Sequence, residues 1–283
     1  MINVIAILMT FARLILFVAL SLLLSATGAQ ANELAPDRLT VMLGAAVLPD
    51  YDGSNDYLTL PATAAFVRVR GHSIALRGTN LSVNLVPERR NQRFHWDAGP
   101  LFNLRLDRSE TPRDPVVALL RKRKVAAEGG GFIGFTKTGV LTSPYDSLSI
   151  RVQAVFDLGN VHRGAVVSAG FDYLMPVSTK SVLGLSGSVD FTDGRYARYY
   201  FGIGPRASAA SRVPEFRPKP GWKGSTLTLL AGTALKGDLR QGLMLGAAVS
   251  YSRLRGDYAA SPLVATRGNR NQIALTAGLA YTF

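Results

Sequence analysis

The sequence predicts an all-β fold, a transmembrane antiparallel β-barrel of about twelve strands, and three observations lead to this prediction. The last segment, NQIALTAGLAYTF, alternates between large apolar residues and small or polar ones. Such a period of two is typical of a strand with two different faces. Apolar residues are abundant, yet no run after residue 31 is long enough for a transmembrane helix. The N-terminus carries a short apolar segment that is typical of an exported protein.

This N-terminal segment predicts a signal peptide over residues 1–31. An apolar core at residues 14–24 follows Arg13, and small residues lead to Ala29-Gln30-Ala31, where we expect cleavage after Ala31. Residues 32–283 then form a single barrel domain. An uncleaved membrane anchor is the alternative, although the core is shorter than the roughly twenty residues that span a bilayer. Both Met1 and Met9 are consistent with a start codon.

Twelve alternating segments follow the signal peptide and are separated by turn residues at the spacing of barrel hairpins. In chain order they are residues 39–47, 60–70, 72–77, 80–86, 93–107, 127–137, 147–157, 163–174, 181–191, 224–235, 240–252 and 271–283. Single-chain bacterial barrels have an even number of strands, with both termini in the periplasm. This parity requires residues 72–86 to be divided at Gly78-Thr79, and ten strands remain an alternative.

The connections also separate by length. Counting back from Phe283, the short connections 236–239, 176–180, 138–146 and 87–92 become periplasmic turns. The long connections become outer loops, at residues 108–126, 192–223 and 253–270. Short periplasmic turns and long external loops are typical of outer-membrane barrels.

The segment 147–157 shows the two strand faces most clearly. Ile150, Val152, Ala154 and Phe156 share one face, which we expect to contact lipid. The other face carries Ser149, Arg151, Gln153 and Asp157. We expect Arg151 and Asp157 to face the lumen, where a charge is hydrated or paired.

Two outer loops have an unusual composition. The loop at residues 48–57 contains Asp50, Asp52 and Asp56. Its oxygen ligands suit calcium, but the spacing lacks the twelve-residue loop that ends in Glu, so a solvated acidic turn is the favoured interpretation. The loop at residues 108–126 predicts a short helix with Asp114 as its N-cap and Pro115 at its first position.

Basic residues mark the candidate contact sites. The run after this short helix consists of Arg121, Lys122, Arg123 and Lys124, and the turn PERRNQ contains Arg89 and Arg90. We consider them candidate contacts for protein partners or anions, with a solvated helix end as the alternative for the first run.

The net charge of +13 fits basic loops that lie beside lipopolysaccharide phosphates or an anionic cell-wall polymer. Membrane lipid and lipopolysaccharide are therefore expected partners. No segment resembles a nucleic-acid reading motif, so we expect no nucleic-acid partner. The chain contains no Cys, which excludes disulfides and thiolate metal sites.

Signals for an enzyme are poor, and we expect no catalytic residue, cofactor or metal site. Gly129, Gly131 and Gly134 match a dinucleotide-binding pattern, but they lie inside an alternating strand. His72 and Ser73 are adjacent and point to opposite faces, so they cannot pair as base and nucleophile. His95 and His162 have no Ser at a suitable spacing. An outer-membrane lipid hydrolase remains the least favoured alternative.

Several segments together resemble one known family. They are PDYDGS (residues 49–54), WDAGP (96–100), AAEGGGFIGF (126–135), RYARYYFGI (195–203), SYSRLRGDYAASPLV (250–264) and GNRNQIALTAGLAYTF (268–283). In this order and spacing they are similar to the MipA/OmpV family of MltA-interacting outer-membrane proteins. The Pro-rich and basic region at residues 205–222 departs from that pattern, which puts in doubt any recognition borrowed from the loops of relatives.

The resemblance implies a non-enzymatic protein of the Gram-negative outer membrane. It implies a scaffold that associates a murein hydrolase, a lytic transglycosylase, with a murein synthase in peptidoglycan remodelling. Other members of the family are described as porin-like channels, surface adhesins or antigens, and these remain alternatives. The family carries no catalytic residues, so none is transferred to this chain.

The last strand predicts a barrel-assembly signal formed by Leu279, Tyr281 and Phe283, which the barrel assembly machinery recognises. Replacing Phe283 with Asp should reduce the amount of folded barrel in the outer membrane without affecting export, because the aromatic terminus also anchors the strand at the membrane interface. Heat-modifiable mobility of envelope protein on a gel measures the folded fraction. An undiminished folded fraction would contradict the prediction.

Overall fold

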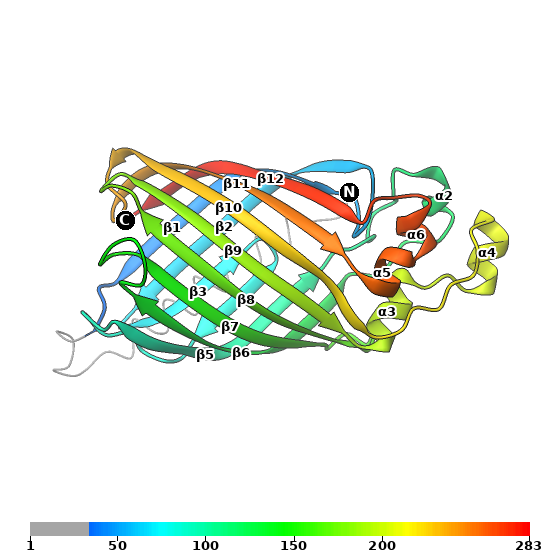
Figure 1. Cartoon of the computed structure of the whole chain (residues 1–283), viewed down its shortest axis with the longest axis horizontal. Coiled ribbons are helices and arrows are strands. Elements are labelled where there is room, and N and C mark those ends of the chain that lie inside the picture. The colour runs from blue at the N-terminus through cyan, green and yellow to red at the C-terminus, as the bar shows by residue number, and fades with distance from the viewer. Residues whose placement is uncertain (1–33) are drawn as a thin grey trace.

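The computed structural model describes residues 34–283, which form a closed antiparallel barrel of twelve strands (Figure 1). The strands are β1 (Arg38–Pro49), β2 (Tyr57–Val69), β3 (His72–Arg77), β4 (Asn80–Asn84), β5 (Phe94–Arg105), β6 (Ala126–Thr138), β7 (Ser147–Asp157), β8 (Ala165–Pro176), β9 (Ser181–Thr192), β10 (Gly221–Gly237), β11 (Gly242–Leu254) and β12 (Asn271–Thr282). The predicted signal peptide, residues 1–31, lies outside the described residues.

Each strand pairs with its neighbours in the sequence, and the first strand pairs with the last. The β1–β12 ladder runs from Thr40 opposite Thr282 to Val47 opposite Leu275. The predicted count of twelve is confirmed, and the alternative of ten is wrong. The decisive division at Gly78-Thr79 is also confirmed, because a two-residue turn with Gly78 at φ +59° separates β3 from β4.

The two ends of the barrel differ in their connections. The chain enters β1 and leaves β12 at one end, which we call the periplasmic end because bacterial barrels have both termini there. Its turns are residues 70–71, 85–93, 139–146, 177–180 and 238–241. The opposite, outer end carries the long loops 106–125, 193–220 and 255–270, with the shorter loops 50–56, 78–79 and 158–164. The predicted short and long connections therefore fall at opposite ends.

The strand faces agree with the alternation in the sequence. On β7, the side chains of Ile150 and Val152 lie on the outside of the barrel and are 47% and 46% exposed. Arg151 and Gln153 line a cavity inside the barrel. Asp157 lies opposite Glu128 in the β6–β7 ladder and shares its face, and its carboxylate accepts hydrogen bonds from the backbone N–H groups of Gly159, His162 and Arg163. Asp157 thus caps the β7–β8 turn, and β8 begins at Ala165 instead of the predicted residue 163.

On the lipid-facing side of the barrel wall, aromatic residues gather near both ends of the barrel. Phe94 and Trp96 contact Phe135 near the periplasmic end, at ring-centroid distances of 5.9 and 5.8 Å. Phe191 stacks on Trp222 near the outer end, at 6.4 Å. Two aromatic girdles that flank an apolar band are typical of transmembrane barrels. Within residues 34–283, none of the helices is long and apolar enough to cross a bilayer.

The glycines of β6 serve packing within the barrel wall. The GxGxxG pattern at Gly129, Gly131 and Gly134 lies inside the strand, as the sequence predicts. A side chain at the adjacent Gly130 would overlap the backbone carbonyl of Ala154 on β7. These residues therefore allow close strand contact and form no phosphate-binding loop.

The faces of β7 generate a prediction about stability. Val152→Arg should reduce the free energy of unfolding by about 2 to 4 kcal/mol, because the charge enters lipid near the middle of the bilayer. Gln153→Arg should be nearly neutral, because it faces the lumen cavity. Refolding titrations in lipid vesicles measure both values, and equal losses in the two variants would contradict the assignment of faces.

Candidate functional site

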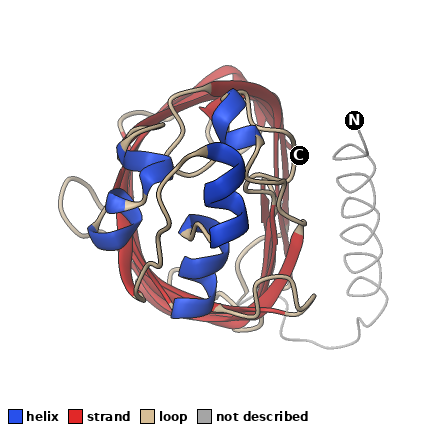
Figure 2. Ribbon diagram, turned by 90° about the vertical axis from the view of Figure 1, so that its right-hand side faces the viewer, coloured by secondary structure: helices blue, strands red, loops and turns tan. Residues whose placement is uncertain are grey.

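Helices from the outer loops lie across the outer mouth of the barrel (Figure 2). They are α3 (Gly194–Phe201), α5 (Gly256–Ala260) and α6 (Pro262–Ala265), whereas α4 (Pro205–Ser211) extends farther from the barrel (Figure 1). Their apolar side chains join one hydrophobic cluster, whose fully buried members include Tyr196, Tyr200, Phe201, Tyr258, Leu263 and Val264. The mouth thus contains a packed core of its own.

The sequence of α3 explains how this helix closes over the barrel. Asp193 caps it by accepting a hydrogen bond from the backbone N–H of Tyr196, at 2.9 Å. The spacing of Tyr196 and Tyr200 places both rings on the buried face of the helix. Arg195 and Arg198 lie on the exposed face. The helix is therefore amphipathic, with aromatic residues toward the lumen and basic residues toward the outside.

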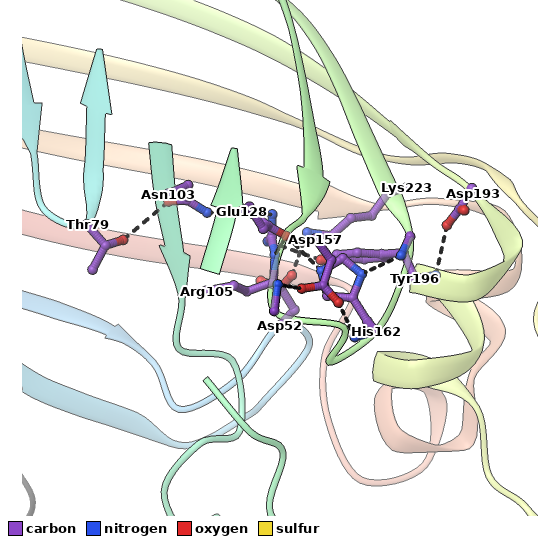
Figure 3. A network of polar contacts seen from close by, with 12 residues as sticks. Asp52, Thr79, Asn103, Arg105, Glu128, Asp157, His162, Asp193, Tyr196 and Lys223 are labelled. Carbon is purple, nitrogen blue, oxygen red and sulfur yellow. Dashed lines mark hydrogen bonds and ion pairs between the residues drawn. The ribbon is translucent and has the colours of Figure 1, made fainter. Parts of the chain in front are cut away.

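A buried carboxylate holds the strand ends together beneath this helix (Figure 3). Glu128 on β6 accepts hydrogen bonds from Asn103 at 2.7 Å and from two nitrogens of Arg105 at 2.7 and 2.9 Å. The side chain of Glu128 is only 1% exposed. A buried carboxylate needs several hydrogen-bond donors to offset its lost hydration. Asn103 and Arg105 supply these donors to Glu128 only when β5 and β6 are positioned as they are here.

His162 completes the partners of Glu128. Its Nδ1 accepts a hydrogen bond from the backbone N–H of Gly164, so the ring proton resides on Nε2 and is donated to Glu128 at 3.0 Å. The imidazole is fully buried, and its ring centroid lies 5.4 Å from that of Tyr196 and 5.6 Å from that of Tyr200. His162 therefore joins the β7–β8 turn to the strand wall and to α3.

A second ion pair joins the first outer loop to β10. The Asp52 carboxylate lies 2.5 Å from the ammonium group of Lys223, and Arg105 donates a hydrogen bond to the hydroxyl of Tyr196 at 3.1 Å. Burial raises the pKa of the Asp52 carboxyl, but the charge of Lys223 outweighs this effect and holds the pKa below its ordinary value. Burial and the neighbouring charge of Asp52 raise the pKa of Asp107 to about 6. Asp107 therefore gains its proton at a higher pH than an ordinary aspartate does.

The acidic loop does not gather its carboxylates around a common point. Asp50 accepts a hydrogen bond from the backbone N–H of Arg113, whereas Asp52 pairs with Lys223. Among residues 34–283, no group of three or more His, Asp or Glu side chains is placed to hold a metal ion. The side chain of Asp52 is 37% exposed, which is compatible with the favoured interpretation of a solvated acidic turn, and the barrel also brings a lysine from a distant strand to it.

The structure confirms the predicted short helix, α2 (Pro115–Ala118). The Asp114 side chain accepts hydrogen bonds from the backbone N–H groups of Val116 and Val117, and Pro115 opens the helix. Asp114 also pairs with Arg267 at 2.7 Å. Its hydrogen bonds to the helix and to Arg267 outweigh its partial burial, so the pKa of this carboxyl is lowered.

The six predicted basic contact residues separate into two groups at opposite ends of the barrel. Arg121, Lys122, Arg123 and Lys124 lie at the outer end, where the Arg123 guanidinium stacks 4.7 Å from the ring centroid of Tyr199. Arg89 and Arg90 lie in the exposed β4–β5 turn at the periplasmic end.

The three residues of the predicted assembly signal also lie toward the periplasmic end. Tyr281 and Phe283 contact each other at 4.7 Å between ring centroids, and Leu279 faces outward on the same strand. The backbone N–H of Phe283 donates a hydrogen bond to the carbonyl of Leu39, so the end of the chain is joined to β1.

Sequence reasoning did not identify Glu128, Arg105 or Lys223 as members of a network. It treated His162 only as a possible base for a serine, whereas its partner is Glu128. In the part of the chain that the structure describes, the hydrogen bonds of the three His residues include none with a Ser hydroxyl. The sequence signal that could have indicated this site is the amphipathic spacing of RYARYYF, which places a tyrosine face opposite an arginine face. The arrangement can lock the outer loops in place, because it joins three of them to the strand ends and to α3.

Comparisons with known proteins agree with a barrel of the outer membrane. The family model described as MltA-interacting protein MipA matches residues 41–283. The comparison with curated proteins gave no match.

Similar solved structures include three outer-membrane proteins. An outer-membrane channel of Pseudomonas putida F1 is 11% identical and has a TM-score of 0.46, with 91% of this chain and 100% of that chain covered. OmpT of Vibrio cholerae is 8% identical with a TM-score of 0.35, covering 91% and 99%. OprD of Pseudomonas aeruginosa is 10% identical with a TM-score of 0.28, covering 90% and 96%.

The buried network generates a prediction about the closed mouth. Glu128→Gln should destabilise the packing of α3 by on the order of 3 kcal/mol, because Arg105 keeps its charge and loses its buried partner. Opening of the outer loop should then become about one hundred times more frequent, so trypsin should cut after Arg195 and Arg198 faster on intact cells.

Glu110→Gln is the matched control, because it removes the same charge from a carboxylate at the same end whose side chain is 62% exposed. Heat-modifiable mobility should stay unchanged in both variants. Equal cleavage rates for the two variants would show that Glu128 does not hold the loop.

Proposed function

Because the chain belongs to the MltA-interacting protein MipA family, we propose that it is a non-enzymatic scaffold for enzymes that remodel peptidoglycan. The chain forms a β-barrel of the Gram-negative outer membrane. The family is named for an interaction with MltA, and the proposed partners are a murein hydrolase and a murein synthase. Such partners would be held at the periplasmic end, on the side of the cell wall.

The β4–β5 turn supports this proposal most directly, because it is exposed and yet firmly anchored. Arg89 forms a β-bridge with Leu34, and the backbone of Glu88 bonds to Ala35 and to Gly71. The Glu88 carboxylate also pairs with Arg68 at 2.6 Å. A docking surface that is already ordered loses little conformational entropy when a partner binds.

The charge of this turn adds a means of attraction. Arg89, Arg90 and Arg93 are exposed within five consecutive residues. Exposed charges steer an oppositely charged partner and increase its association rate, and added salt weakens this effect. A basic surface at the periplasmic end therefore favours partners with an acidic face.

The packed outer mouth supports the same proposal from the other end. Tyr196, Tyr200 and Phe201 form the buried face of α3. Under them Arg105 pairs with Glu128, and Lys223 pairs with Asp52. A packed core across the mouth would obstruct a wide diffusion channel. In a protein that acts by surface contact, the same core adds stability.

A porin-like channel is the second candidate, and the polar lumen favours it. A cavity of about 270 Å³ lies between the strands and is lined by Arg77, Arg151 and Asp172 with several hydroxyl side chains. Charged and hydrated walls of this kind line channels of outer-membrane barrels. Conductance of the purified barrel in planar bilayers tests this alternative, and steady single-channel currents in the wild-type protein would favour it over the scaffold.

The scaffold proposal predicts that the double variant Arg89→Glu, Arg90→Glu captures less murein hydrolase and murein synthase from envelope extracts. We expect about tenfold weaker capture at low ionic strength and a smaller difference at high ionic strength, because the attraction between exposed charges is screened. Crosslinking followed by pull-down of the full-length protein measures the captured enzymes.

The control is Lys122→Glu, Lys124→Glu, which makes the same charge change at the outer end of the barrel. This control should capture the enzymes as the wild-type protein does. If the wild-type protein captures no murein enzyme, or if both double variants behave alike, the scaffold proposal fails.

A further inference from the structure

A basic groove lies among the outer loops, on the outside of the packed mouth. Its volume is about 1310 Å³, and seven arginines line it. Arg121 and Arg123 come from the β5–β6 loop, Arg163 comes from the β7–β8 turn, and the other four come from the β9–β10 loop with its helices α3 and α4. Segments that are far apart in the sequence therefore place their positive charges around the same groove.

The charges of this groove are not neutralised within the described part of the chain. None of its seven guanidinium groups has a carboxylate within 4.0 Å, and Glu215 is the only acidic residue in the lining. Beneath the mouth, by contrast, Arg105 pairs with Glu128 and Lys223 pairs with Asp52. Because clustered like charges repel one another, an unpaired cluster of this size indicates a place for an external anion.

Arg123 gives an independent sign of a missing partner. Its Nε is buried and has no hydrogen-bond partner among the described residues, while its ring contact is with Tyr199. Burial and the nearby charge of Arg108 lower the pKa of Arg123 to about 10, so the side chain remains charged at neutral pH. The guanidinium of Arg123 therefore adds to the groove a positive charge that no carboxylate of the described residues neutralises within 4.0 Å.

The chemistry of the lining selects the class of anion. Arginine presents a planar fork of donors that matches the oxygen atoms of phosphate. The groove has more than forty times the volume of one water molecule, which occupies roughly 30 Å³. A ligand with several anionic groups can contact more of the seven arginines in a groove of this volume than a single phosphate ion can.

We propose that this groove binds a ligand with clustered phosphate groups. The groove belongs to the outer loops, beyond the ends of the membrane-spanning strands, so it meets ligands on the outer side of the membrane. The phosphorylated headgroup of a glycolipid and a soluble polyphosphate share the required chemistry. The site is independent of the scaffold proposal, because Arg89 and Arg90 lie at the opposite end of the barrel.

Binding of two probes to the full-length barrel in neutral detergent tests the proposal. The soluble probe is tripolyphosphate, followed by calorimetry, and the lipid probe is a bisphosphorylated glycolipid in mixed micelles of the same detergent, with its dephosphorylated form as the reference. Arg121→Gln, Arg198→Gln should weaken binding of at least one phosphorylated probe by tenfold or more, because each arginine donates charge-assisted hydrogen bonds. Binding of the glycolipid alone identifies a lipid headgroup, and binding of tripolyphosphate identifies a soluble source.

The matched control is Arg89→Gln, Arg90→Gln, which removes the same charge at the periplasmic end and should leave the affinity unchanged. Arg121→Lys, Arg198→Lys should recover part of the affinity, because lysine restores charge without the fork of donors. Heat-modifiable mobility verifies that each variant is folded. The proposal is overturned if neither phosphorylated probe binds the wild-type protein, or if the control loses as much affinity as the groove variant.

Discussion

Backbone pairing between β1 and β12 closes the sheet, and the remaining structure depends on this closure. In hydrocarbon there is no water to satisfy a free N–H or C=O group, and each unsatisfied group costs several kcal/mol. The ladder from Thr40–Thr282 to Val47–Leu275 leaves the wall without an edge. An even number of strands then follows, with short turns at one end and room for long loops at the other.

Closure also determines what the outer loops can do. The strand ends form a ring, so the loops that leave it must fold over a common opening. Glu128 at the start of β6, Lys223 near the start of β10 and Asp52 in the first outer loop therefore meet beneath α3 (Figure 3). Apolar burial supplies the free energy of this second core, and the paired charges restrict it to one arrangement. The same ring leaves the basic face of α3 turned outward, toward the groove.

The sequence predicted the barrel wall well and the outer network poorly. Alternation and turn chemistry are local signals, so they located the strands, the division at Gly78-Thr79 and the Asp114 cap. The network rests on contacts between loops that are distant in the sequence, and periodicity carries no information about them. Asp157 illustrates the limit, because the alternation predicts the face of its side chain but not the three backbone donors that the following turn supplies.

The junction of the first and last strands has a consequence for how the chain folds. The side chain of Gln272 on β12 donates hydrogen bonds to the carbonyls of Tyr51 and Ser54 in the first outer loop, and Ser54 forms a bridge with Gly268. These contacts join residues that are synthesised early in translation to residues that are synthesised last. A fold whose seam has such a large sequence separation has a high contact order and cannot close until the whole chain has been delivered. The first outer loop can therefore reach its final contacts only after the last strand is in place.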